Sequence, residues 1–327
     1  MTSPEILVAI AGHGLNPSLR RFIESPLDSG AWRTLVAKLE TGKLTALALA
    51  AATGGALPVT EEQGDELRHR SARAMKRREA AAQCLGEIGT VLNREAIDSC
   101  VLHGAATSAL DYPEADLRLY ESADVLVAPA HHDDAVALLQ EKGVLRVPAH
   151  ERRSRRRGDV RFVAANGVNV GVHFSITPRR FGGAIQTGDL LASRIWFSPR
   201  GVRLGALGAE ERLLSACIHA RFGASTSDLL AQRDVVQLVL RDDLALRRVE
   251  RLASSWRVEA VLADAVRRAW GTFAVPDVVP ISAWSRAYRP HRRDRWRLAS
   301  HPLPMAPHGA GLLADLGGSA AASGAGS

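Results

Sequence analysis

The hydrophobic pattern of residues 96–176 alternates as in β-strands, whereas the chain on both sides follows helical spacing. Within this segment the turn-forming "ANG" (165–167) stands between two short valine-rich stretches, which predicts a hairpin. The stretches that fit strands are "DSCVL" (98–102), "ADVLV" (123–127), "DVRFVA" (159–164) and "VNVGVHFSI" (168–176). A chain with this pattern is expected to form a sheet with helices before and after it.

The flanking helices are predicted by apolar residues that recur at intervals of three and four. Residues 29–94 and 205–273 follow this spacing over most of their length. The residues expected to form the buried stripes are Trp32, Leu35, Val36, Leu39, Met75, Leu85, Ile88, Leu92, Leu213, Leu214, Cys217 and Ile218. From about residue 301 the chain consists largely of Gly, Ala, Ser and Pro, a composition typical of a flexible tail.

These patterns predict an α+β protein in four parts. A small mixed, mainly antiparallel sheet in residues 96–204 is flanked by an N-terminal helical region at 1–95 and a C-terminal helical region at 205–300. A flexible tail follows at 301–327. The helical regions are expected to pack over the sheet and to leave a cleft there.

Charge and cysteine content narrow the partners and the compartment. The formal net charge of +7 comes mostly from arginine and favours an anionic partner: a nucleotide, nucleic acid or an acidic peptide. Cys84, Cys100 and Cys217 are widely spaced and form no CxxC pair, which fits a reducing cytoplasm. The longest apolar stretch, "LTALALAAATGGALPV" (44–59), is interrupted by glycines and too short to span a bilayer, so no membrane partner is expected.

A candidate metal site lies at the start of the second predicted strand. Ser122 and Asp124 are two residues apart, so their side chains lie on the same face of that strand. In a large class of phosphoryl-transfer enzymes, two aspartates at this spacing bind divalent metal ions. Here one of the two positions holds a serine.

The order of short motifs along the chain resembles that of a known protein family. The motifs are "VLHGAA" (101–106), "YP" (112–113), Arg118, "SADVLV" (122–127), "VGVHF" (170–174), "LLSACIHA" (213–220) and Asp234. In this order the sequence is similar to the uncharacterised bacterial nucleotidyltransferase-like proteins of the polymerase-β-type superfamily. Similar blocks extend from about Trp32 to residue 276, so the resemblance covers most of the chain.

The resemblance implies a metal site that this chain has only in part. Two aspartates at i and i+2 and a third carboxylate on a neighbouring strand hold two Mg²⁺ ions in such enzymes, and these bridge the nucleoside triphosphate. The corresponding residues here are Ser122, Asp124 and Gly171, and His103 stands where the family has a lysine. One carboxylate of three is present, so Mg²⁺ is expected to bind weakly, with a nucleoside triphosphate as substrate or ligand.

The resemblance and the cleft together define the candidate site residues. For catalysis they are Asp124, His103 and His173; for nucleotide binding they are His103, Gly104, Arg118 and Ser122; the expected metal ligand is Asp124. Each has a structural alternative. Asp124 then pairs with Arg118 at the start of the strand, His103 and Gly104 form a plain turn, and His173 is a hydrogen-bonded residue of the sheet, the commoner case for a lone strand histidine.

Other histidines are expected to be structural. His219 lies on an apolar helical face and is expected to be a core residue. "HHDD" (131–134) is expected to begin a helix, with its aspartates complementing the positive end of the helix dipole.

Two arginine-rich runs are candidate anion-binding surfaces. The first contains Arg152, Arg153, Arg155, Arg156 and Arg157, and is expected to lie on an exposed loop. The second, "RPHRRDRWR" (289–297), follows the last predicted helix and includes Trp296. Either run can contact phosphates, and an aromatic ring among arginines can stack on bases. A solvated basic loop is the alternative for both.

Three functions remain open on the sequence alone, so whether the chain is an enzyme is left undecided. The first is an active nucleotidyltransferase with Mg²⁺ at Asp124. The second, favoured by the missing carboxylates, is an impaired or repurposed member, a pseudoenzyme that binds a nucleotide or another anionic partner. The third is a non-nucleotidyl enzyme or accessory protein that uses His103 and His173. Nucleic-acid binding through the arginine runs is a further alternative.

Overall fold

The structure is a computed structural model that describes residues 3–15, 23–146, 159–177, 185–223, 229–276 and 279–299. None of the helices in these ranges combines the length and the apolar character that a membrane span needs. The chain divides into two compact units, each assembled from segments far apart in the sequence. The first unit comprises residues 1–74, 220–240 and 260–327, and the second comprises residues 75–219 and 241–259.

The first unit is helical in its described residues. Its helices are α1 (Ser3–Ala11), α2 (Ser29–Thr41), α3 (Thr45–Thr53), α9 (Leu229–Val239), α11 (Glu259–Phe273), α12 (Pro280–Ala287) and α13 (Arg292–Ala299). Helix α4 (Glu61–Arg94) begins in this unit and ends in the second, and α8 (Ala209–Phe222) begins in the second and ends in the first.

The second unit contains the sheet. Its strands are β1 (Ser99–Val101), β2 (Ser122–Val127), β3 (Leu145–Arg146), β4 (Asp159–Ala164), β5 (Asn169–His173), β6 (Ile195–Phe197) and β7 (Leu204–Ala206). The helices that belong wholly to it are α5 (Gly104–Leu110), α6 (His132–Glu141), α7 (Thr187–Ala192) and α10 (Leu246–Trp256).

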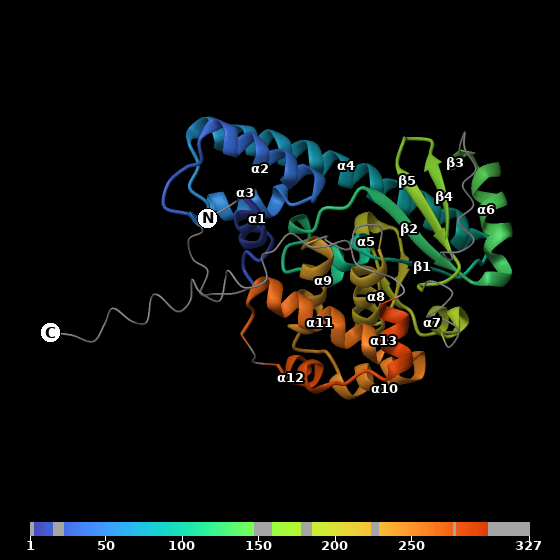
Figure 1. Ribbon diagram of the computed structural model, residues 1–327. Helices are drawn as coiled ribbons and strands as arrows, with labels where there is room; N and C mark the ends of the chain where they lie inside the picture. The colour runs from blue at the N-terminus through green and yellow to red at the C-terminus, as the bar shows by residue number, and fades with distance from the viewer. Residues whose placement is uncertain are drawn as a thin grey trace. The chain divides into compact units, whose positions relative to one another are not determined.

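The strands form one sheet in the order β3-β4-β5-β2-β1-β7-β6, so β2 lies at its centre. Strand β2 pairs in parallel with β5 and antiparallel with β1, and β5 pairs antiparallel with β4 (Figure 1). The β4–β5 hairpin is the one that the "ANG" turn predicts. As a result, β2, β5 and β4 lie side by side and can contribute side chains to one site.

The sheet corrects the expected architecture in two respects. It is mixed, not mainly antiparallel, because β2–β5 and β1–β7 are parallel pairs, and β2–β5 lies at the centre. Within the described ranges it also has seven strands, whereas four were predicted. The missed strands β3, β6 and β7 have two or three residues each, which is too short for an alternating pattern to appear in the sequence.

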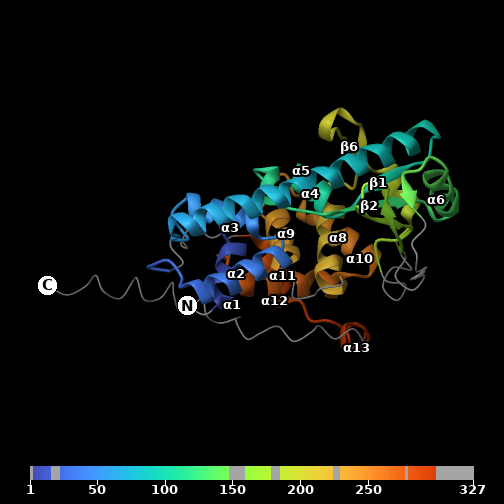
Figure 2. The same ribbon diagram turned by 90° about the horizontal axis from the view of Figure 1, so that it is seen from above.

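Alternation along the strands gives the sheet one apolar face. Ala123, Val125 and Val127 of β2 and Val170 and Val172 of β5 are all buried in one hydrophobic core. The same core contains residues of α4 and α6, and Figure 2 shows α4 running along this side of the sheet. The opposite face carries the residues between them, including Ser122, Asp124 and His173, because successive strand side chains point to opposite faces.

The predicted helical stripes are confirmed by burial. The stripe residues named from the sequence are buried apart from Met75, which is half-buried. Helix α2 begins as a capped helix should, since the Asp28 carboxylate accepts hydrogen bonds from the backbone N–H groups of Gly30 and Ala31. Helix α6 begins at His132 with Asp133 and Asp134 in its first turn, as expected for "HHDD".

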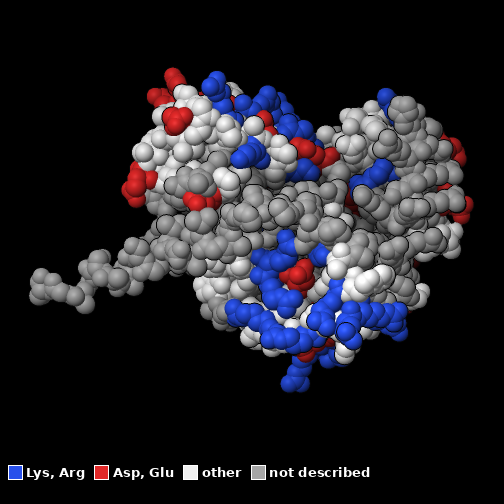
Figure 3. Space-filling model, in the orientation of Figure 1, with Lys and Arg blue, Asp and Glu red and all other residues white. Residues whose placement is uncertain are grey.

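The second arginine run is partly helical, whereas a solvated basic loop was the structural alternative for it. Helix α13 covers Arg292–Ala299, and its arginines Arg292, Arg293 and Arg295 are exposed, as is Trp296, with 66% of its surface open. Lys and Arg side chains gather on this part of the first unit, where Figure 1 labels α11, α12 and α13 (Figure 3). Nucleic-acid binding by this surface stays a prediction.

Candidate functional site

Asp124 lies next to Gly171, and Gly171 lies next to Arg161. In the parallel pairing of β2 with β5, Asp124 is opposite Gly171. In the antiparallel pairing of β5 with β4, Arg161 is opposite Gly171. The three residues therefore form one row across three neighbouring strands. The residue at the position of the third carboxylate is a glycine, as the sequence comparison with the superfamily pattern implies, and it lies directly beside Asp124.

The Asp124 carboxylate is buried and fully engaged by neighbouring side chains. Its Oδ2 accepts a hydrogen bond from the Ser122 hydroxyl at 2.7 Å. Its Oδ1 accepts one from Arg161 Nη1 at 3.1 Å and lies 2.9 Å from His173 Nε2. Arg118 is not among its partners, so the proposed pairing of Asp124 with Arg118 is replaced by a pairing with Arg161.

These contacts keep Asp124 ionised. Burial alone raises the pKa of its carboxyl group, because a low-dielectric environment disfavours the charged form. The hydrogen bond and charge of His173 and the charge of Arg161 outweigh burial and hold the pKa well below its usual range. The site therefore contains a fixed negative charge whose compensating positive charge comes from protein side chains.

Gly171 leaves the space in which these side chains meet. A Cβ atom added at this position would overlap Asp124 Oδ1 and would lie 2.7 Å from His173 Nε2. It would also lie 3.2 Å from Arg161 Nη1. All three contacts of the added Cβ atom are closer than ordinary van der Waals contact. A glycine inside a strand commonly marks such a close approach, and here the approaching groups are Asp124 and Arg161 from the two neighbouring strands and His173 from the same strand.

Three histidines form a chain of contacts that begins at the buried carboxylate, with His173 against Asp124 and His103 between His173 and His219. The ring of His103 lies 6.0 Å from that of His173 and 4.4 Å from that of His219, measured between ring centroids. His103 follows β1, whose ladder continues through a hydrogen bond from Leu102 N–H to the Asp124 carbonyl at 2.9 Å. His219 comes from α8, so the helix following the sheet contributes to the cluster.

His103 is held in an unusual state and conformation. Burial, then the nearby His219, lowers its pKa well below the ordinary value; Asp124 opposes this shift, and His173 and Arg161 add to it. His103 is therefore a neutral imidazole at neutral pH. Its backbone has φ 53° and ψ −133°, a region that glycine favours, and such strain tends to occur at functional sites.

Gly104 and Arg118 lie together beside the start of α5. A Cβ atom at Gly104 would lie 2.8 Å from Tyr120 Cβ and 3.4 Å from Arg118 Nη1, so glycine is needed for this packing. Arg118 is buried, and its Nη1 donates to the Leu119 carbonyl at 2.6 Å. Nucleotide binding by these residues stays a prediction. The residues of the first arginine run, Arg152 to Arg157, lie outside the described part of the chain.

The residues present do not fit a two-metal centre. Among the described residues, no three His, Cys, Asp or Glu side chains are arranged to hold a metal ion. Asp124 is the one carboxylate at the three positions that the superfamily pattern assigns to metal ligands, and both its oxygens already accept hydrogen bonds. A guanidinium group, which repels a metal cation, lies against that carboxylate.

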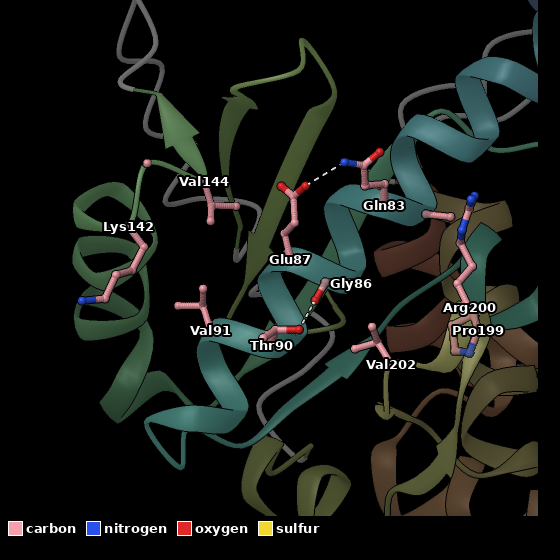
Figure 4. A pocket seen from close by; sticks show the side chains of 12 residues that line it. Gln83, Gly86, Glu87, Thr90, Val91, Lys142, Val144, Pro199, Arg200 and Val202 are labelled. Atoms are coloured by element: carbon pink, nitrogen blue, oxygen red, sulfur yellow. Dashed lines mark hydrogen bonds between the residues drawn. The ribbon is translucent and has the colours of Figure 1, made fainter.

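Two cavities of the second unit lie elsewhere. The larger, of about 560 Å³, borders α4 and is lined by Glu87, Lys142 and Arg200 around an apolar floor that includes Val91 and Val202. Figure 4 shows Lys142 on one side of α4 and Arg200 on the other. The smaller cavity, of about 220 Å³, contains Arg78, Tyr120 and Ser108. The residues described as lining the two cavities do not include Asp124, His103 or His173.

Sequence reasoning missed two members of the Asp124 cluster. Arg161 was not selected, although counting back from the "ANG" turn places it opposite Gly171. His219 was assigned to the core, although it is part of the "LLSACIHA" motif. A third missed feature is a buried ion network: Asp111 accepts from Arg212 Nη2 at 2.7 Å and from Arg241 Nη1 at 2.9 Å.

Comparison with known proteins shows the family to which the chain belongs. Residues 28–273 match the family described as "Uncharacterised nucleotidyltransferase", and the chain belongs to this family. No curated protein matches the sequence. Among solved structures, a nucleotidyltransferase-like antigenic protein from Paracoccidioides brasiliensis is similar, with 13% identity and a TM-score of 0.33 over 53% of this chain and 90% of that chain.

Proposed function

We propose that this nucleotidyltransferase-like protein binds a nucleoside triphosphate, or a ligand with similar phosphate groups, at the Asp124 site without two-metal nucleotidyl transfer. The observation that carries the proposal is the pairing of Asp124 with Gly171. It leaves one carboxylate where the family resemblance implies three. Two-metal catalysis needs carboxylates to hold both ions in line with the reacting oxygens. A single, hydrogen-bonded carboxylate cannot place them.

Retention of the remaining cluster supports binding rather than loss of the site. Asp124, His103 and His173 are buried or packed together, yet they are polar and mutually hydrogen-bonded or in ring contact. Buried polar clusters cost free energy unless fully satisfied, so a decayed site is expected to fill with apolar residues. The positive charges at this site and the basic composition favour an anionic ligand.

Turnover and binding measured together test this proposal. Purified protein incubated with a panel of nucleoside triphosphates and Mg²⁺ or Mn²⁺ should release no pyrophosphate above the blank, whereas calorimetry should detect binding of at least one of them. Asp116→Asn, at an exposed carboxylate, serves as a control for Asp124→Ala. Rapid pyrophosphate release that Asp124→Ala abolishes and Asp116→Asn preserves would show an active nucleotidyltransferase and refute the proposal.

A second candidate function is acid–base catalysis by the histidines. The observation that favours it is the Asp124–His173 contact of 2.9 Å next to the neutral His103, since a carboxylate that orients an imidazole is a common acid–base arrangement. This candidate predicts an activity that persists in EDTA and is lost in His173→Gln. An activity that EDTA abolishes would exclude it.

A further inference from the structure

We propose that the guanidinium of Arg161 occupies the role of the missing metal ion, so that the site binds the phosphates of its ligand without a divalent cation. This inference rests on the proposed function and names how the same site recognises its ligand. It is carried by the geometry of the row Asp124, Gly171 and Arg161, by the charges in that row, and by the exposure of Arg161.

The geometry requires the glycine between the two charged residues. Neighbouring strands are separated by about 4.8 Å, so β4 and β2 are about 10 Å apart with β5 between them. Arg161 nevertheless reaches Asp124, with Nη1 3.1 Å from Oδ1, because Gly171 has no side chain in the path. The third carboxylate of the superfamily pattern and the arginine cannot use this space together.

The guanidinium takes the place beside the carboxylate that a bound cation would take. The permanently charged Arg161 pairs with Asp124, with Nη1 3.1 Å from Oδ1. Ser122 and His173 hold the carboxylate in place from the other sides. Asp124 is then a positioning residue that orients Arg161, whereas in a two-metal enzyme it would orient a metal ion.

The exposure of the pair shows which partner can meet a ligand. The Asp124 side chain is 10% exposed, whereas the Arg161 side chain is 55% exposed. A ligand approaching from solvent therefore reaches the arginine first. The planar guanidinium matches phosphate oxygens in a two-point arrangement, which a lysine ammonium does not reproduce. The expected ligand class is a polyphosphate, such as the triphosphate of a nucleotide.

Calorimetry with inorganic tripolyphosphate and with ATP, each in EDTA, tests the inference. Wild-type protein should bind both. Arg161→Met should weaken binding by about tenfold or more, as is usual for the loss of a charged hydrogen bond. Arg251→Met removes an exposed arginine of α10 and should change affinity by less than about twofold, the usual scale of surface substitutions. The affinity of Arg161→Lys should lie between those of Arg161→Met and Arg251→Met, because lysine keeps the positive charge and loses the two-point donor geometry of the guanidinium.

Gly171→Ala tests the geometry without changing any charge. Its added methyl group takes the space beside Arg161 Nη1 and Asp124 Oδ1, so binding in EDTA should weaken as in Arg161→Met. Thermal melting establishes that each variant is folded. If Gly171→Ala does not fold, Arg161→Met, which changes an exposed side chain, is sufficient to test the inference.

The outcomes separate this inference from the proposed function. Binding that appears only with Mg²⁺ or Mn²⁺, or that Arg161→Met leaves unchanged, would overturn the inference and leave nucleotide binding intact. An absence of ATP and tripolyphosphate binding in every condition would overturn both. Metal-free binding that depends on Arg161 and not on Arg251 is the result we expect.

Discussion

Arg161 Nη1 lies 3.1 Å from Asp124 Oδ1, although the two residues come from strands separated by a third. Gly171, on the strand between them, is the residue that makes this contact possible. The superfamily resemblance implies a carboxylate at the glycine and a metal ion beside Asp124. We propose that in this protein the Arg161 guanidinium takes the place of the metal ion, in the space that Gly171 leaves.

Ser122→Asp should create a site that responds to metal. The new carboxylate would replace a hydroxyl that now donates to Asp124 Oδ2, so two negative charges would meet. In EDTA we expect the free energy of unfolding to fall by about 1–3 kcal/mol, because like charges in contact disfavour the ionised pair. Millimolar Mn²⁺ should raise the melting temperature of this variant by binding the pair.

Ser122→Asn is the matched control for that experiment. It has nearly the same size as aspartate and no charge, so Mn²⁺ should not raise its melting temperature. An equal response of both variants to Mn²⁺ would contradict the placement of residue 122 beside Asp124. Ser122→Asp is made without a second carboxylate at residue 171, because even the Cβ atom of Gly171→Asp would overlap the Asp124 carboxylate.

Gly104→Ala should destabilise the second unit. Its Cβ would lie 2.8 Å from Tyr120 Cβ, an atom fixed close to the backbone, so the start of α5 or β2 must shift. Overpacking of this kind typically costs about 1–3 kcal/mol. Gly188→Ala in α7 is the control, since nothing lies within 4 Å of its added Cβ, and it should stabilise by up to about 1 kcal/mol as a helix glycine replaced by alanine. Urea denaturation that ranks the two variants equally would refute this packing.

Asp111→Asn should be among the most destabilising single changes in the chain. The Asp111 side chain is fully buried and pairs with both Arg212 and Arg241. Removal of one partner from a buried ion network leaves an uncompensated charge and typically costs about 3–5 kcal/mol. Asp116→Asn breaks a pair in which the carboxylate is 69% exposed, and should cost less than about 1 kcal/mol. Chemical denaturation of both variants measures the difference; similar midpoints would count against a buried network.

Stability should fall as the pH decreases from about 7 to 5, with a contribution from His103. Its folded pKa is well below the ordinary value, so the unfolded chain binds a proton below about pH 6.5 that the folded chain does not. The groups that face it are His219, Asp124, His173 and Arg161. Each proton bound only by the unfolded state costs at most about 1.4 kcal/mol per pH unit.

His103→Asn removes the imidazole that binds this proton in the unfolded chain. The variant should therefore show a flatter pH dependence of the free energy of unfolding over the same range. Asparagine tolerates a positive φ better than most residues. His69→Asn, at an exposed histidine of α4, is the control. Asp124 acts in a separate window: its folded pKa is lowered, so its contribution is present above about pH 4 and is lost at lower pH. An unchanged slope in His103→Asn would contradict a neutral, buried imidazole.

The sequence predicts the parts of this fold that depend on local pattern. The helical stripes, the β4–β5 hairpin and the α+β class follow from hydrophobic spacing and turn chemistry. The short strands β3, β6 and β7 do not, because their pairing depends on the rest of the sheet. The same distinction holds at the site. Motif order predicts a site at Asp124, whereas Arg161 reaches Asp124 and His219 reaches His103 through register across strands and through the position of α8, which no local pattern encodes.

A crystal structure of the protein with a non-hydrolysable ATP analogue and Mn²⁺ tests the central claim most directly. The anomalous signal of manganese locates the ion independently of the ligand. We predict triphosphate oxygens within hydrogen-bonding distance of the Arg161 guanidinium, the Arg161–Asp124 contact retained, and no manganese coordinated by Asp124. A manganese ion bound to the Asp124 carboxylate, with Arg161 displaced from it, would contradict the account.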